Sequence, residues 1–128
     1  MLATGVALAS LNTAPTTPGT PTTWGNNTYG QLGNGPDNNN NSNSAAPVAV
    51  STFGFNGAKV IAGGANHSLA LQKTRTGVVA KAWGHGISGQ LGNGTYGHFN
   101  RVPVQVSNLS GFTAIAAGGE HSLALYSY

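Results

Sequence analysis

Short apolar segments alternate with polar, glycine-rich turns along most of the chain. In the second half the apolar segments span residues 77–84 (GVVAKAWG), 102–106 (VPVQV), 112–117 (FTAIAA) and 121–126 (HSLALY), and the first half repeats this set less clearly. Segments of this length suit single strands, and no segment has the sustained periodicity of a long amphipathic helix. The pattern therefore predicts an all-β fold of short strands joined by turns.

Two blocks of sequence occur twice, in the same order. WGNNTYGQLGNG begins at Trp24 and WGHGISGQLGNG at Trp83, an offset of 59, with eight of twelve letters identical. GAKVIAGGANHSLAL begins at Gly57 and GFTAIAAGGEHSLAL at Gly111, an offset of 54, with nine of fifteen identical. The length changes fall in polar segments, as expected when buried strands fix their spacing and surface loops accept insertions.

These repeats divide the chain into three parts. We assign residues 24–71 to repeat 1 and residues 72–128 to repeat 2. Residues 1–23 contain a strand, whose Val6-Ala7-Leu8 resembles Leu69-Ala70-Leu71, and a Thr/Pro-rich connection. Four short strands in a repeat of ~50 residues indicate a β-propeller blade of four antiparallel strands. The N-terminal strand is then expected to end a preceding blade.

Two repeats are too few to close a ring, because propellers have roughly four to eight blades. The chain is therefore expected to form an incomplete ring unless it assembles with other chains. It could also be a fragment of a longer propeller or a subunit of an open filament. Exposed sheet edges and apolar faces would favour association over a stable monomer.

The paired WG…GQLGNG, Pro-Val and HSLAL segments resemble repeats of the regulator of chromosome condensation family, in a bacterial-type form. The resemblance extends over nearly everything from Trp24 onward. It implies membership of families whose known members are seven-bladed β-propellers. These members include a nuclear exchange factor for a small GTPase, secreted bacterial inhibitors of β-lactamases and many extracellular bacterial proteins. The shared letters build the blade and do not identify which function applies.

The recurring positions are expected to be structural. Leu32 and Leu91 should pack between blades, and Gln31 and Gln90 should bond the turn backbone. Each Trp is expected to anchor the core with its indole N–H on a carbonyl oxygen. The full set of structural repeat positions is Trp24, Gly25, Gln31, Leu32, Gly33, Gly64, His67, Leu69, Leu71, Trp83, Gly84, Gln90, Leu91, Gly92, Gly118, His121, Leu123 and Leu125.

His67 and His121 each precede a serine, but a catalytic His/Ser pair is not expected. Adjacent strand residues point to opposite faces, so the imidazole and the hydroxyl cannot meet. Because both histidines occupy the same repeat position, we expect each to be buried and to bond backbone of a neighbouring strand or blade.

Composition argues against an enzyme and against a bound cofactor. The chain has no cysteine, and its two acidic residues are Asp37 and Glu120. A metal site needs three or four ligands, so zinc or copper held by His85 and His98 is a minor alternative. We expect no catalytic residues, no resident metal and no cofactor.

Charge and hydropathy limit the partners. The net charge of +3 reflects scarce acidic residues, while the five Lys and Arg residues are scattered, so no nucleic-acid surface is expected. No segment approaches the roughly 20 apolar residues that span a bilayer. The first ten residues are interpreted as a strand, with a processed leader as the alternative. The Asn, Thr and Ser content favours an extracellular or cell-surface location.

The segments that differ between repeats are the candidate binding loops. They supply the candidate residues Asn26, Asn27, Tyr29, His85 and His98. Our leading hypothesis is a non-enzymatic repeat module for self-assembly or protein binding, within a β-propeller or a filament or surface assembly. Its partners would be copies of itself, the rest of a longer propeller chain, or another protein. The alternatives are a nucleotide-exchange or chromatin-associated regulator and a secreted enzyme inhibitor.

Overall fold

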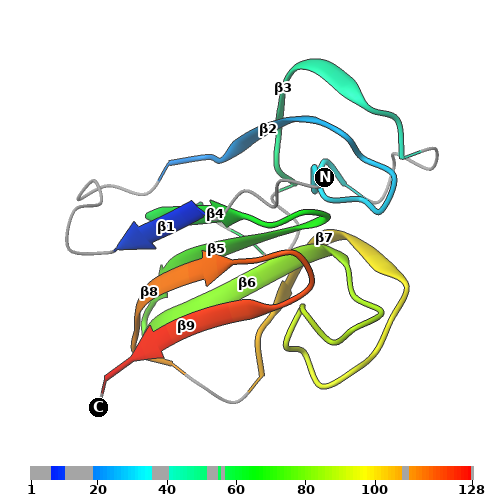
Figure 1. Ribbon diagram of the computed structural model, residues 1–128. Coiled ribbons are helices and arrows are strands. Elements are labelled where there is room, and N and C mark those ends of the chain that lie inside the picture. Colours follow the sequence, from blue (N-terminus) through cyan, green and yellow to red (C-terminus); the bar gives the residue numbers. More distant parts are fainter. Residues whose placement is uncertain are drawn as a thin grey trace.

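The computed structural model describes the backbone of residues 7–10 and residues 19–35, 41–51, 55, 57–107 and 110–127 (Figure 1). These residues contain no helix that is long and apolar enough to cross a membrane. They form nine strands: β1 (Ala7–Ser10), β2 (Thr22–Gly25), β3 (Ser44–Ala49), β4 (Val60–Gly63), β5 (His67–Thr74), β6 (Gly77–His85), β7 (Phe99–Gln105), β8 (Phe112–Ala117) and β9 (Ser122–Tyr126). The all-β prediction is confirmed.

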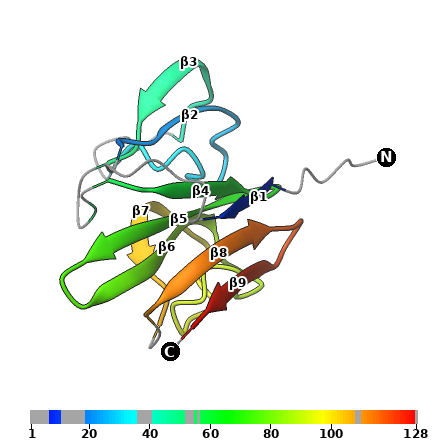
Figure 2. The ribbon, with the colours of Figure 1, turned by 90° about the vertical axis from the view of Figure 1, so that its left-hand side faces the viewer.

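A four-stranded antiparallel sheet with the order β4-β5-β6-β7 lies at the centre. The pair β2–β3 packs on one side of this sheet and the pair β8–β9 on the other, as Figure 2 shows from the side. This arrangement is that of part of a β-propeller that is not closed. The central sheet is one complete blade, and each flanking pair supplies two strands.

The sheets are out of step with the sequence repeats. The central sheet takes β4 and β5 from repeat 1 and β6 and β7 from repeat 2. At the offsets that relate the repeats, β2–β3 corresponds to β6–β7, and β8–β9 corresponds to β4–β5. Each repeat therefore contributes two strands to one blade and two to the next, which ties neighbouring blades together.

The N-terminal strand joins the sheet of repeat 2. Strand β1 pairs antiparallel with β8, from Ala7 opposite Ala117 to Ser10 opposite Ala114. It lies at the edge of β8 away from β9, in the order β1-β8-β9. The pairing therefore places these residues beside the C-terminal strands. The sequence interpretation instead placed them at the end of a preceding blade.

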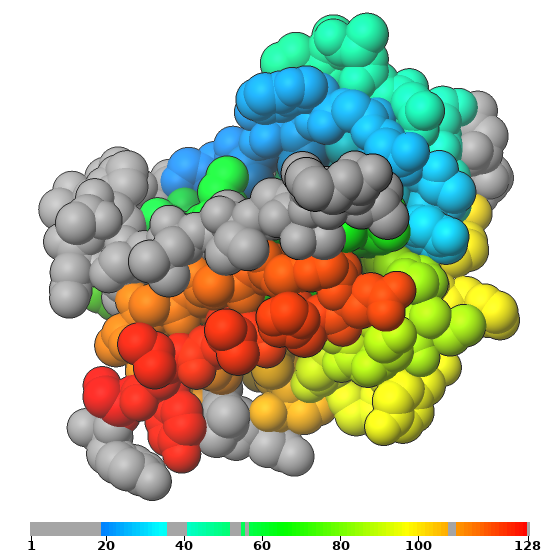
Figure 3. All heavy atoms as spheres, viewed as in Figure 1, coloured from blue at the N-terminus to red at the C-terminus, as the bar shows by residue number. Residues whose placement is uncertain are grey.

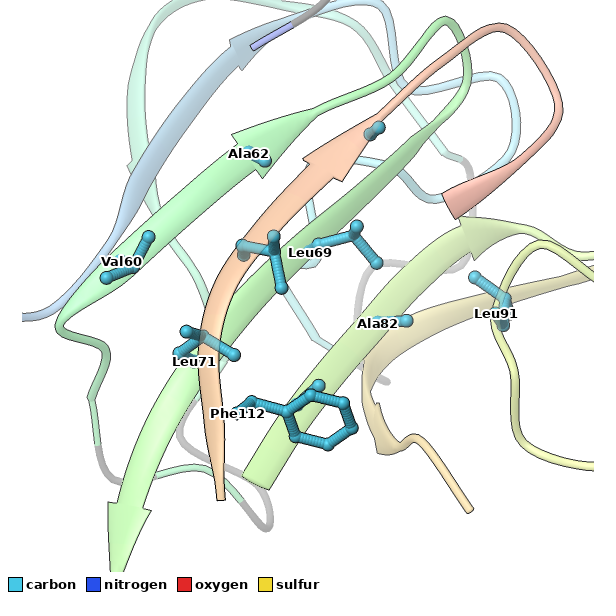
Figure 4. Close-up of a cluster of buried hydrophobic side chains, with 10 residues drawn as sticks. Val60, Ala62, Leu69, Leu71, Ala82, Leu91 and Phe112 are labelled. Carbon is cyan, nitrogen blue, oxygen red and sulfur yellow. The ribbon is translucent and has the colours of Figure 1, made fainter. Parts of the chain in front are cut away.

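Two apolar clusters lie on the two faces of the central sheet. Alternate residues of β5 point to opposite faces, so Leu69 and Leu71 face β8 while Ala70 faces the β2–β3 side. The larger cluster, drawn in Figure 4, consists of Val60, Ala62, Leu69, Leu71, Ala80, Ala82, Leu91, Phe112, Ile115 and Ala117. The smaller consists of Val50, Phe55, Ala58, Ala70 and Trp83. Burial of both faces makes the central blade the core of the molecule.

Candidate functional site

Trp83 on β6 joins the two repeats. Its side chain is 1% exposed, and its indole Nε1–H donates to the carbonyl oxygen of Gln31 at 2.9 Å. A Cβ on Gly33 would lie 2.5 Å from the same Nε1 atom, so only glycine leaves room for the ring there. Phe55 flanks the indole with ring centroids 6.0 Å apart. The predicted bond from indole to carbonyl is confirmed for this tryptophan.

The two repeated glutamines close the loops that carry them. Gln31 Oε1 accepts the backbone N–H of Tyr29 at 2.8 Å, and Gln90 Oε1 accepts that of Ser88 at 2.9 Å. The leucines that follow, Leu32 and Leu91, are buried. The predicted bonds from glutamine to turn backbone and the predicted burial of both leucines are confirmed.

Two equivalent serines fasten β5 and β9 to the glutamine loops. Ser68 Oγ donates to the carbonyl oxygen of Gln31 at 2.9 Å, and Ser122 Oγ donates to that of Gln90 at 2.7 Å. A carbonyl oxygen only accepts, so each hydroxyl proton is committed to its carbonyl. Each serine oxygen keeps its lone pairs for a donor from another repeat.

His67 supplies such a donor across the repeat boundary. Its Nε2 lies 2.9 Å from Ser122 Oγ, and because that hydroxyl already donates to Gln90, the imidazole must carry its proton on Nε2. The expected burial of His67 is confirmed. The partner of Nε2 is a side-chain hydroxyl, which the sequence did not predict.

The other nitrogen of this histidine, Nδ1, is buried without a hydrogen-bond partner in the described part of the chain. Burial lowers the pKa of His67, and the backbone of His121 opposes this only in part. The imidazole is therefore neutral at neutral pH. A Cβ on Gly64 would lie 2.5 Å from Cε1 of the ring, so any larger residue at this position, three before the histidine, would collide with the imidazole.

Four repeat positions are exposed although their counterparts in the other repeat are buried. Trp24, Leu123 and Leu125 are 63%, 62% and 68% exposed, and His121 is also exposed. Their counterparts Trp83, Leu69, Leu71 and His67 are buried because the neighbouring repeat covers them. The described residues place no strand over the four exposed side chains. The expected roles of Trp24 as a core anchor and of His121 as a buried histidine are therefore wrong for the described part of this chain.

The variable loops after β2 and β6 meet on one side of the molecule, where cyan and yellow-green atoms adjoin in Figure 3. The rings of Tyr29 and His85 pack against each other at an angle of 36°, with their centroids 4.2 Å apart. His85 Nδ1 lies 3.3 Å from Gln90 Nε2, which places the amide donor of the second loop on the imidazole. In the first loop, Gln31 Nε2 donates in the same way to Asn26 Oδ1 at 3.1 Å.

Asn27 is corrected from binding candidate to loop scaffold. It is 1% exposed, and its Oδ1 accepts the backbone N–H of Leu32 at 3.0 Å. Its backbone N–H in turn donates to Asn43 Oδ1 at 2.8 Å. Its side chain is therefore used inside the turn. His98, by contrast, is exposed, and its carbonyl oxygen accepts the N–H of Gly86 at 3.2 Å.

Sequence reasoning missed Asn41, Phe99 and Arg101, which belong to the same surface. Arg101 Nε donates to Asn41 Oδ1, and its guanidinium lies over the Phe99 ring at 5.0 Å. Asn41 Nδ2 donates to the carbonyl oxygen of Thr28 at 3.1 Å. One signal was available, because Arg101 is the sole Asp, Glu, Lys or Arg between Lys81 and Glu120. We call the residues Asn26, Thr28, Tyr29, Asn41, His85, Ile87, His98, Phe99 and Arg101 the loop surface.

The described residues contain no group of three or more His, Asp or Glu side chains that could hold a metal ion. The full chain has no cysteine. The arrangement can therefore offer hydrogen bonds, aromatic faces and one guanidinium to a ligand.

Comparison with known proteins identifies the repeats. Residues 23–71 and 82–125 match the model of the regulator of chromosome condensation (RCC1) repeat. E3 ubiquitin-protein ligase HERC2 of Homo sapiens and that of Mus musculus are each 39% identical to this chain over 120 residues. The aligned region is 91% of this chain and 2% of each ligase, so the chain spans a small part of these relatives. The matched segments cover most of the chain, and it belongs to the RCC1 repeat family.

Proposed function

We propose that this chain is a non-enzymatic protein-binding module that presents its loop surface to a partner polypeptide. The observation that carries the proposal is that recurring and differing positions of the two repeats lie in different places. Those that recur in both repeats build the contact between repeats, whereas those that differ gather on the loop surface. Surface loops on a rigid repeat scaffold commonly carry the binding function of a repeat protein.

The chemistry of the loop surface suits a polypeptide. Tyr29, His85 and Phe99 offer aromatic faces, and Ile87 is an exposed apolar side chain. The Arg101 guanidinium adds a cation beside them. Aromatic residues and arginine are the side chains that contribute most to protein interfaces.

The absence of cysteine from the sequence supports a role without catalysis. Without a thiol, the chain offers no thioester-forming nucleophile and no thiolate ligands for zinc. We therefore do not extend the ligase activity in the name of its relatives to this segment. An extracellular or cell-surface location remains the proposal drawn from composition.

Site-specific photo-crosslinking tests this function. A photoreactive amino acid at Ile87 should capture a defined partner protein in extracts of the source cells, identified by mass spectrometry. The same amino acid at Thr76, an exposed turn residue at the opposite end of β6, is the matched control and should not capture it.

The purified partner then allows an affinity measurement. Tyr29→Ala and His98→Ala should each weaken binding about tenfold or more if they lie at the centre of the contact. Capture of the same proteins from positions 87 and 76, or affinities unchanged in both variants, would refute a specific loop surface.

A further inference from the structure

The side-chain amide of Gln90 joins two parts of its loop. Its Oε1 accepts the backbone N–H of Ser88 at 2.9 Å, and its Nε2 lies 3.3 Å from Nδ1 of His85. A backbone N–H only donates, so the bond to Ser88 fixes which end of the amide faces the imidazole. An amide nitrogen also only donates, so His85 Nδ1 is the acceptor and carries no proton. The ring in this arrangement is therefore neutral, with its proton on Nε2.

Protonation of His85 would place two donors face to face. An imidazolium carries N–H groups on both nitrogens, so Nδ1 could no longer accept from the Gln90 amide. Rotation of the amide by half a turn would bring Oε1 to the new Nδ1–H group. That bond has a charged donor and is about twice as strong as a neutral one. The same rotation takes Oε1 away from the N–H of Ser88, which loses its acceptor.

We propose that protonation of His85 turns the Gln90 amide over and loosens residues 86–89, so that the loop surface binds its partner at neutral pH and releases it in acid. The proposal rests on the protein-binding function above, because it concerns the regulation of that same surface. Residues 86–89 carry Ile87, the exposed apolar side chain of the loop surface. We call the Gln90 amide with its partners Ser88 and His85 the amide switch.

The loop keeps part of its structure in both states. The N–H of Gly89 donates to the carbonyl oxygen of Gly86 at 3.0 Å, and the N–H of Gly86 donates to that of His98 at 3.2 Å. Neither bond involves a side chain that titrates. Acid therefore frees the middle of the turn, where Ile87 and Ser88 lie, without unfolding the segment.

The first glutamine loop contains the same amide without the switch. Gln31 Oε1 accepts the N–H of Tyr29 at 2.8 Å, and Gln31 Nε2 donates to Asn26 Oδ1 at 3.1 Å. Asn26 is the counterpart of His85 at the offset of 59. Histidine changes its charge between about pH 5 and pH 8 and asparagine does not, so this loop keeps its bonds in acid. Trp83 of the second repeat packs against this loop, so the amide has the same arrangement where a following repeat covers it.

Groups of both signs surround His85. Within the described part of the chain, the titratable and charged residues around it are Tyr29 after β2, His67 on β5, His98 and Arg101 at β7, and Glu120 after β8. An imidazolium is attracted by the Tyr29 ring and by Glu120, and repelled by Arg101. Because these contributions oppose one another, the bond to Gln90 decides which amide orientation accompanies each form of the ring.

Nuclear magnetic resonance of the purified protein tests the amide switch without a partner. The ring nitrogen shifts of His85 should show Nδ1 unprotonated and Nε2 protonated at neutral pH. Acid should then accelerate hydrogen exchange at the Ser88 amide about five- to tenfold relative to the Tyr29 amide, because only Ser88 loses its bond. Circular dichroism at each pH checks that the protein remains folded.

The two repeats supply matched variants. His85→Asn introduces the residue that the first repeat has at this position, so the Ser88 amide should keep its protection in acid. Asn26→His makes the reverse exchange, and should give the Tyr29 amide the acid sensitivity that Ser88 has in the wild type. His98→Asn removes an exposed histidine near the same loop, and the response of Ser88 should remain.

The partner captured through Ile87 extends the test to binding. Between pH 8 and pH 5 the Kd should rise about five- to tenfold for the wild type and less than about twofold for His85→Asn, because only the wild type loses one hydrogen bond. Titration of the partner itself affects both proteins equally. The difference between the two pH ratios therefore reports the amide switch, whatever the affinity of each protein at pH 8.

A proton on Nδ1 of neutral His85, or the same acid response of Ser88 in the wild type and in His85→Asn, would overturn the proposal. Equal pH ratios of binding in these two proteins would also overturn it, while leaving the proposed function standing. An acid response confined to the wild-type Ser88, in a protein that captures no partner through Ile87, would support the amide switch and remove the proposed function.

Discussion

The indole N–H of Trp83 is bonded to the carbonyl oxygen of Gln31, 52 residues earlier in the chain. One bond thereby links the first strand of repeat 2 to the glutamine loop of repeat 1. Ser68 donates to the same oxygen from β5. Three segments distant in sequence meet at one carbonyl group, and this junction sets how neighbouring blades stack.

The two tryptophans should differ sharply in their effect on stability. Trp83→Ala removes a buried ring and an indole donor, and should lower the free energy of unfolding by about 3–5 kcal/mol. Trp24 is mostly exposed, so Trp24→Ala should change it by less than about 0.5 kcal/mol. Urea denaturation of dilute protein measures both. Equal losses would contradict the different environments of these residues.

Gly64 and Gly118, which lie three residues before His67 and His121, provide a second matched pair. A Cβ on Gly64 would lie 2.7 Å from the Gly118 carbonyl oxygen as well as against the buried His67 ring, so alanine should cost about 1–3 kcal/mol. The three atoms nearest to a Cβ on Gly118 all belong to the His121 ring, which is exposed and can rotate away. Gly118→Ala should therefore be nearly neutral. Thermal unfolding compares them, and a larger loss for Gly118→Ala would refute this account.

Much of the fold follows from local sequence because strands and turns leave regular signals. The segment 112–117 was predicted with the bounds that β8 has, and 77–84 differs from β6 by one residue. The role of the Trp83 indole also followed, since a large aromatic with one donor usually finds an acceptor when buried.

The exposure of Trp24 and Leu123 did not follow from the sequence. Repeat positions show what a side chain contacts when its neighbour is present, whereas exposure depends on which repeats surround it. The loop surface was missed in part for a similar reason. Arg101 reaches Asn41 across 60 positions, and no local pattern reports such a contact.

Asn27 should be essential to the first glutamine loop although it stands in a variable segment. Asn27→Ala leaves the buried N–H of Leu32 without its acceptor, and should destabilise the protein by about 1–3 kcal/mol. Thr28→Ala, the neighbouring exposed position, should stay within about 0.5 kcal/mol. Hydrogen exchange at the Leu32 amide should accelerate in the first variant only. Unchanged protection at that amide would show that another group satisfies it.

Acid should weaken the fold through His67. Its pKa in the folded protein lies below the ordinary value of 6.5 because burial disfavours the charged ring. The unfolded chain therefore takes up the proton first as pH falls, so stability is full above about pH 6.5 and declines below it, down to the folded-state pKa. The neutral ring donates from Nε2 to Ser122 and has no acceptor for a second proton at the buried Nδ1.

His67→Gln keeps an amide donor but does not titrate, so its unfolding midpoint should vary less between pH 5 and pH 8. His98→Gln removes an exposed histidine and should keep the wild-type slope. A slope that survives in His67→Gln and disappears in His98→Gln would assign the acid sensitivity to the surface.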